Sequence, residues 1–236
     1  MSNNKISKFW IIALFVTIIA AVALGLVINQ ITKGKNVYHL TFNEISLTKI
    51  EDLNLNNIDN INIVKEKFID NSTSAFIYKD NEDGELKAAI KLDGKSYYIG
   101  QVSMENTPDN LFGIEDAEVF GKKAVKFYGL LGSNYAQAFY WFVDKKANSV
   151  IQIDGNTTEI DLDNDNIKEI VATTGTIPET KIYTTKDSKI YVSDVNGSTG
   201  AKSVYLQDEN NKLFEVFFES NKPEKFVFSK NSFIRQ

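Results

Sequence analysis

The chain has 236 residues, of which 31 are acidic and 26 basic, and its formal net charge at pH 7 is −5. Because it has no cysteine, disulfide frameworks, thiol catalysis, thiolate-bound zinc and iron–sulfur clusters are excluded. Arg235 is the single arginine, and arginine is the side chain that pairs best with phosphate, so we expect no nucleic acid partner. The richness in Lys, Asn and Ile suggests a bacterial source with a low-GC genome.

The N-terminal segment from Phe9 to Ile31 is uncharged and strongly apolar. At 1.5 Å per residue, a helix of this length covers a hydrocarbon core of roughly 30 Å. We expect residues 1–8 to be a short cytoplasmic tail and residues 9–31 a transmembrane signal anchor in the lipid bilayer. The protein is then a single-pass protein of the cell membrane, with the bulk of the chain extracytoplasmic. The A-x-A sequence at residues 21–23 leaves cleavage as a signal peptide open.

Residues 32–73 follow the expected anchor and have mixed spacing. The run "SLTKIEDL" is closer to helical spacing, whereas "LNLNNIDNINI" partly alternates, as in a strand. We expect a membrane-proximal extension, partly strand, that either packs on the following domain or acts as a stalk. His39, the single histidine, lies in this extension, and we do not expect it to be catalytic.

From residue 74 to 236, short runs of aromatic and β-branched residues alternate with turn residues. Asp93-Gly94 between "LKAAIKL" and "SYYIGQVSM" is typical of a two-residue hairpin turn. The spacing predicts roughly ten to twelve short strands and no helix beyond the anchor. We therefore expect an all-β extracytoplasmic domain of antiparallel sheets, either a sandwich or a few propeller-like blades, after one N-terminal transmembrane helix.

The stretch "IDLDNDNIKEIV", residues 160–171, is a candidate calcium loop. Asp161, Asp163 and Asp165 fall at loop positions one, three and five, the carbonyl of Ile167 at seven and the side chain of Glu169 at nine. Alternate oxygen donors in a tight loop suit Ca²⁺, which takes six to eight oxygen ligands. Crowded carboxylates also repel one another, and a cation relieves that repulsion. The alternative is an acid-rich, solvated turn without metal.

The longer stretch "DLDNDNIKEIVATTG" is similar to the D-x-D-x-D-G-x-x-[DE]-hydrophobic loop of FG-GAP/VCBS repeats, the calcium-binding hairpins of integrin-α-type propellers. The resemblance is limited to about residues 160–175. It implies Asp161, Asp163, Asp165 and Glu169 as side-chain ligands of a structural Ca²⁺ and an extracellular setting. Asn166 stands where the family has glycine.

Two other groups of residues have a structural and a functional interpretation. The aromatic stretch from Lys126 to Asp144 predicts a core strand, and the alternative is a stacking platform that uses the residues Tyr128, Tyr135, Tyr140 and Trp141. The lysines at 122, 123 and 126 predict a solvated hairpin, and the alternative is contact with anionic lipid or wall polymer.

No nucleophile elbow, zinc-protease helix, phosphate loop or dinucleotide fingerprint occurs in the sequence, and we do not expect an enzyme. We expect a binding or interaction module at the cell surface, whose partner is a surface protein or a cell-wall glycan. Two alternatives stay open. One is a cell-surface hydrolase that uses paired carboxylates, which leave no local motif. The other is a regulatory or assembly subunit of a membrane complex.

Overall fold

The computed structural model describes residues 37–54, 61–79, 84–132, 135–144 and 149–236. In this part of the chain every strand pairing is antiparallel, so the expected all-β fold class is confirmed. The expected transmembrane segment, residues 9–31, lies outside the described residues. Within the described ranges, no helix is both long and apolar enough to cross a membrane.

The described strands form four sheets of five strands each, and each sheet contains four consecutive strands joined as a meander. Sheet I has β4 (Glu51–Leu53), β5 (Asn62–Asp70), β6 (Thr73–Lys79), β7 (Glu85–Leu92) and β8 (Lys95–Met104). Sheet II has β3 (Thr48–Lys49), β9 (Gly113–Val119), β10 (Lys122–Leu130), β11 (Ala136–Phe142) and β12 (Ser149–Asp154). Sheet III has β2 (Asn43–Glu44), β13 (Asn156–Ile160), β14 (Glu169–Thr174), β15 (Glu179–Lys186) and β16 (Lys189–Asp194). Sheet IV has β1 (Val37–His39), β17 (Ser203–Asp208), β18 (Leu213–Glu219), β19 (Lys222–Ser229) and β20 (Ser232–Arg235).

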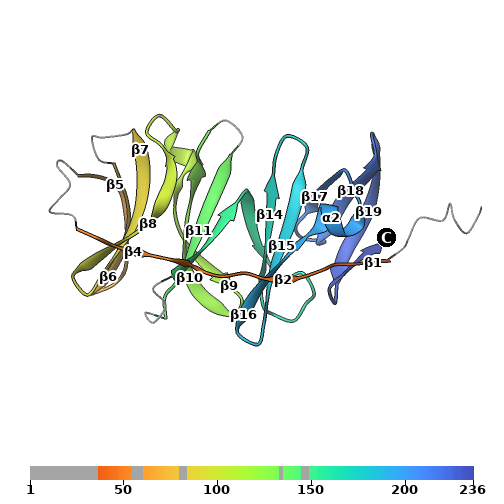
Figure 1. Ribbon diagram of the computed structural model, residues 1–236, viewed down its shortest axis with the longest axis horizontal. Helices are drawn as coiled ribbons and strands as arrows, with labels where there is room; N and C mark the ends of the chain where they lie inside the picture. The colour runs from red at the N-terminus through yellow and green to blue at the C-terminus, as the bar shows by residue number, and fades with distance from the viewer. Residues whose placement is uncertain (1–36, 55–60, 80–83, 133–134, 145–148) are drawn as a thin grey trace, which may run out of the picture. The chain divides into compact units, whose positions relative to one another are not determined.

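The fifth strand of each sheet comes from one N-terminal segment, residues 37–53, which we call the strap. The strap crosses the four sheets in the reverse of chain order (Figure 1). Its strands β1, β2, β3 and β4 pair with β20, β16, β12 and β8, the last strand of each meander. For residues 32–73 the sequence left open whether the segment packs on the following domain or forms a stalk. The described residues from 38 onward belong to the compact unit Tyr38–Gln236. The expected boundary after residue 73 falls inside the β5–β6 hairpin.

Three apolar clusters join successive sheets. The cluster between sheets I and II includes Ile77, Ile90, Phe127 and Trp141. The cluster between sheets II and III contains Tyr140, Ile153 and Ile170, and the cluster between sheets III and IV contains Ile182, Phe214 and Phe226. Sheets II and III therefore bury apolar side chains on both faces, which explains why β11 is apolar except for the buried Gln137. Within the aromatic stretch, Trp141 and Tyr140 are core residues as predicted, whereas Tyr135 is exposed.

The turns lie at two opposite edges of the sheets. The acidic loop, residues 161–168, and the two-residue turns after β7, β9, β15 and β19 lie at one edge, which we call the loop rim. The connections from each sheet to the next, with the turns after β10, β14 and β18, lie at the other edge, the connection rim (Figure 1). A backbone hydrogen bond joins sheets II and III at the loop rim, where the Phe120 amide donates to the Lys168 carbonyl.

Helical structure is limited to two short pieces in the described residues. A 3₁₀ turn, η2 (Asp109–Leu111), lies in the connection from sheet I to sheet II. One α-helix, α2 (Val195–Thr199), lies between sheets III and IV in the chain, so the expectation of no further helix is wrong at this point. Its start is specified by the Asp194 carboxylate, which accepts the Gly197 amide at 2.9 Å, and its end by Gly200 in the left-handed region.

Gly129 in β10 is required by the close approach of sheets I and II. An added Cβ would lie 2.2 Å from the Val102 carbonyl oxygen in β8. We expect Gly129→Ala to lower the free energy of unfolding by about 1 to 3 kcal/mol, because the backbones must separate. Gly132→Ala is the control, since its added Cβ meets nothing within 4 Å. Urea unfolding measures both, and equal effects of the two variants would contradict this account.

Candidate metal centre

The acidic loop between β13 and β14 folds around the first of its aspartates. The two carboxylate oxygens of Asp161 accept the backbone amides of Asp165 and Asn166, each at 3.1 Å. Asn164 and Asn166 have φ of 66° and 67°, in the left-handed region that asparagine tolerates better than most residues. Asn166 thus adopts the sharp turn for which glycine is usual. The loop is closed by its own hydrogen bonds.

Three of the predicted ligands converge. Asp161, Asp163 and Glu169 each offer a carboxylate oxygen, and these three atoms lie within 4.8 Å of one another. Asp165 is not part of this trio, and one of its oxygens accepts the Ile167 amide at 2.7 Å. Asp165 and Ile167 nevertheless line the same hollow as Asp163 and Glu169.

Glu169 is the buried member of the trio, with 3% of its surface exposed. Its Oε2 accepts the Leu162 amide at 2.8 Å, and among the described residues it takes part in no ion pair. Burial, together with the negative charges of Asp163 and Asp165, raises the pKa of Glu169 to about 7, although the hydrogen bond from the Leu162 amide lowers it. Partial burial, then the charges of Asp165 and Asp161, also raise the pKa of Asp163.

The acids open into a hollow of about 360 Å³ where sheets III and IV meet the strap. Its other lining residues come from the strap, from β15 and β16, and from the β19–β20 turn: Phe42, Thr184, Thr185, Lys186, Tyr191 and Asn231. The turn between β17 and β18 reaches the loop as well, because Lys212 Nζ donates to Asn164 Oδ1 at 2.6 Å. An ion bound by the three carboxylates would therefore lie next to the strap, sheet III and the β19–β20 turn of sheet IV.

The donor set fits calcium. The available ligands are carboxylate, carbonyl and water oxygens, which hard cations prefer, whereas zinc prefers nitrogen and sulfur. Asp161 accepts two amides, but an ionised carboxylate has about four acceptor positions and keeps some for a metal. The three carboxylates supply part of a calcium shell, and backbone carbonyls and water complete it. Bound calcium would also neutralise the buried charge of Glu169.

A second polar cluster, between sheets II and III, was not found by sequence reasoning. Lys126 is 7% exposed, and its Nζ lies 2.8 Å from Glu159 Oε1 in β13 and 3.4 Å from the Thr157 carbonyl oxygen. The Tyr140 hydroxyl donates to Glu159 and lies 2.8 Å from Thr157 Oγ1. Burial and the charge of Glu159 raise the pKa of Tyr140 far above its ordinary value.

This cluster corrects the expectation that Lys126 belongs to a solvated hairpin. Lys122 and Lys123 are exposed at the start of β10, whereas Lys126 lies in the middle of the strand, opposite Glu115 and Tyr140. The pattern that could have revealed it is a lone lysine inside the apolar run "AVKFYGLL". A charge in a core strand needs a partner, and the neighbouring sheet supplies Glu159.

No family model, curated protein or solved structure matches this chain. The described part of the chain defines the fold class, which is that of an all-β protein with four antiparallel sheets. The resemblance of residues 160–175 to an FG-GAP/VCBS repeat stays a prediction.

Proposed function

We propose that the protein is a membrane-anchored, extracytoplasmic binding module whose acidic loop holds a structural Ca²⁺. The observation that carries the proposal is the buried Glu169 carboxylate, which lies beside that of Asp163 and in no ion pair among the described residues. Such a carboxylate must either keep its proton or bind a cation. Asp161, Asp163 and Glu169 are the direct ligands, with Asp165 and the Ile167 carbonyl as further oxygen donors at the same hollow.

The role of the ion is structural: it stabilises the acidic loop against the neighbouring parts of the fold. The hollow is lined by side chains of the strap, of sheet III and of the β19–β20 turn in sheet IV. Calcium would hold the loop in place against them, so that an extracellular supply of calcium stabilises the folded surface. Sites of extracellular modules bind calcium with dissociation constants of about 10⁻⁴ to 10⁻³ M, which suits this role.

The arrangement of the strands supports the blade-like alternative over a sandwich. Each sheet contains a separate four-stranded meander, and the middle sheets are packed on both faces, as in successive blades. The acidic loop joins the first and second strands of its meander. A scaffold of this kind presents loops at two rims for a surface protein or a cell-wall glycan.

Isothermal titration with CaCl₂ at pH 7.5 tests the metal site. We expect the full chain to bind one calcium ion, and we expect Asp163→Ala to abolish binding because it removes a converging carboxylate. Glu179→Ala, an exposed acid at the start of β15 and away from the loop, is the matched control and should bind as the parent does. Absence of binding by the parent chain would leave an acid-rich turn and remove the proposed site.

A further inference from the structure

A second hollow lies between sheets I and II, beside the strap. Its volume is about 470 Å³, within the range of small-molecule pockets, which is roughly 300 to 1,000 Å³. The strap, β8, β11 and β12 each contribute side chains to its wall. The acidic loop is not part of it, so this hollow is separate from the candidate metal centre.

The inner wall of this hollow depends on two special features of β8. An added Cβ at Gly100 would lie 2.4 Å from the Phe139 ring of β11, so only glycine admits the ring in this position. Next to Gly100, the register between β7 and β8 shifts at Ile99, which forms a bulge. Bulges are common beside binding sites, where they redirect side chains.

Gln137 is the buried polar group of the hollow. It is 5% exposed, and alternation along β11 places it on the face of Phe139 and Trp141, which pack in the cluster between sheets I and II. Its side-chain amide forms no hydrogen bond with the described part of the chain. A glutamine amide has donors and acceptors that normally find partners when buried. An amide that lines a hollow without such a partner is available to a ligand.

The other polar groups of the wall favour a neutral ligand. Gln152 of β12 is exposed and Gln101 of β8 is half-buried, and both line the hollow with Gln137. Side-chain amides both donate and accept hydrogen bonds, as sugar hydroxyls do. The charged residues of the wall are Lys49 and Glu51, whose opposite charges balance. The wall therefore suits a molecule that is rich in hydroxyl groups and carries no net charge.

Tyr135 supplies an aromatic surface at the same hollow. It is 47% exposed, and of the four aromatic residues considered as a stacking platform it is the one that lines this wall. A hydrogen bond with the Asp154 carboxylate raises the pKa of Tyr135, so its hydroxyl keeps the proton. The exposed ring can pack against the C–H face of a sugar ring. The charge of Asp154 beside it disfavours an anionic ligand.

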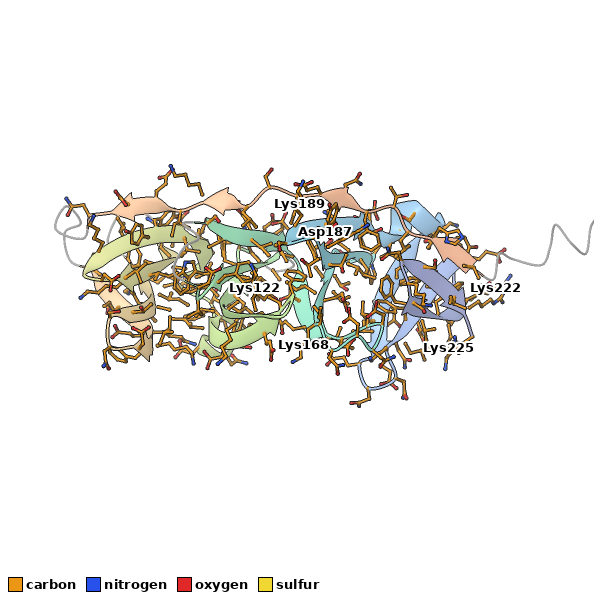
Figure 2. The ribbon with its side chains drawn as sticks, turned by 90° about the horizontal axis from the view of Figure 1, so that it is seen from below. Lys122, Lys168, Asp187, Lys189, Lys222 and Lys225 are labelled. Carbon is orange, nitrogen blue, oxygen red and sulfur yellow. The ribbon has the colours of Figure 1, made fainter. Side chains whose placement is uncertain are left out.

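The strap argues against a peptide as the ligand. Peptides commonly bind by adding a strand to a regular open sheet edge. At this hollow the strap already pairs with β8 up to Tyr98, where the bulge at Ile99 follows, and with β12 at Ser149 and Val150. Figure 2 shows the strap along one side of the sheets, with Lys189 of β16 beside it. The edges left open are short and, in β8, irregular, whereas a sugar needs only side chains.

We propose that the hollow between sheets I and II binds a neutral oligosaccharide, with hydrogen bonds to the amides of Gln137 and Gln152 and a sugar ring stacked on Tyr135. This site rests on the binding-module part of the proposed function, for which it supplies the class of ligand. It does not depend on the acidic loop, which belongs to sheet III.

The test follows the glutamine side-chain amides by NMR in the full chain, with isotope-labelled glutamine, in dodecylphosphocholine micelles, which contain no sugar. The probes are maltotriose, cellotriose and the trimer of N-acetylglucosamine. We expect at least one of them to shift the signals of Gln137 and Gln152. The signal of Gln207, exposed in β17 of sheet IV, should stay unchanged. Each signal is assigned by its absence from the spectrum of the variant that lacks that glutamine.

Gln137→Leu should weaken oligosaccharide binding at least about tenfold, because a hydrogen-bonding group is lost. The same variant should be no less stable than the parent in urea, because the amide has no partner in the described part of the chain. Gln152→Ala, an exposed change, should also weaken binding, whereas Gln207→Ala, equally exposed, should not. A clearly destabilised Gln137→Leu, or binding that neither Gln137→Leu nor Gln152→Ala weakens, would overturn the proposal.

Calcium titration of the same samples separates this site from the metal site. A chain that binds calcium but shows no shift with any of the three oligosaccharides would overturn the sugar site and keep the metal site. Shifts with an oligosaccharide in a chain that binds no calcium would support the sugar site alone. Shifts at Gln137 and Gln152 with the blocked tripeptide acetyl-trialanine amide, and none with the sugars, would assign the hollow to a peptide and also overturn the proposal.

Discussion

Lys126→Met is expected to lower the free energy of unfolding by about 3 to 5 kcal/mol, the usual result of removing one partner of a buried ion pair. The lysine side chain is 9% exposed and that of Glu159 20%. Without the lysine, the Glu159 carboxylate stays between sheets II and III, where the Tyr140 hydroxyl is its one remaining hydrogen-bond partner among the described residues. Urea unfolding at pH 7 measures the loss.

A double-mutant cycle separates the pair from the packing of its aliphatic stem. Adding Glu159→Gln to Lys126→Met removes the unpaired charge, while the Tyr140 hydroxyl keeps Thr157 as its partner. We expect the double variant to regain at least half of the loss, because the penalty arises from an isolated charge. Lys67→Met, which breaks the exposed pair of Lys67 with Asp116, is the control and should cost less than about 1 kcal/mol. A double variant as unstable as Lys126→Met alone would show that the loss comes from packing.

The strand pattern of the long meanders could be predicted because local chemistry specifies it. Asp93-Gly94 adopts the predicted hairpin turn, with φ positive at both residues, 49° and 81°. The same geometry recurs at Phe120-Gly121 and Lys230-Asn231, where the residue types indicate it less clearly. At these two turns, the pairing of the flanking strands imposes a positive φ that Phe120 and Lys230 would rarely adopt by themselves.

The strap could not be predicted, because its strands are too short to show a period. β2 and β3 have two residues each, and both are exposed. They form because β16 and β12 present unpaired edges, a property of the assembled sheets. For residues 74–236, sequence reasoning expected roughly ten to twelve strands, and the structure describes fifteen there, β6 to β20.

The acidic loop and the Lys126 cluster show the same contrast at the level of sites. The loop is local, so alternate spacing places Asp161 and Asp163 on one side, and Glu169 joins them at the first residue of β14. The Lys126 pair joins residues in different sheets, and only the packing of β10 against β13 brings Glu159 to the lysine. No spacing rule along the chain contains that information.

In chelator, the stability of the folded protein is expected to fall as the pH rises from about 5 to 8. The pKa of Glu169 is about 7 in the folded protein, against 4.5 for an ordinary glutamate. Between these values the folded state binds more protons than the unfolded state, so the free energy of unfolding decreases with increasing pH. The loss is on the order of 2 to 3 kcal/mol at 1.36 kcal/mol per pKa unit. Glu169→Gln, which has no proton to lose, should remove this part of the pH dependence, and an unchanged slope would contradict the assignment.

Calcium should reverse this loss at pH 7.5, because a metal binds the deprotonated ligands. If the site binds with a dissociation constant of about 0.1 mM, 10 mM calcium adds roughly 2.7 kcal/mol. For a domain of this size that corresponds to a rise in melting temperature of about 5 to 10 °C over chelator. The rise should be lost in Asp163→Ala and in Asp165→Ala and kept in Glu179→Ala. It should also shrink at pH 5, where the proton on Glu169 competes with the metal. Equal melting temperatures in calcium and chelator at pH 7.5 would mean that Glu169 is accommodated by protonation alone.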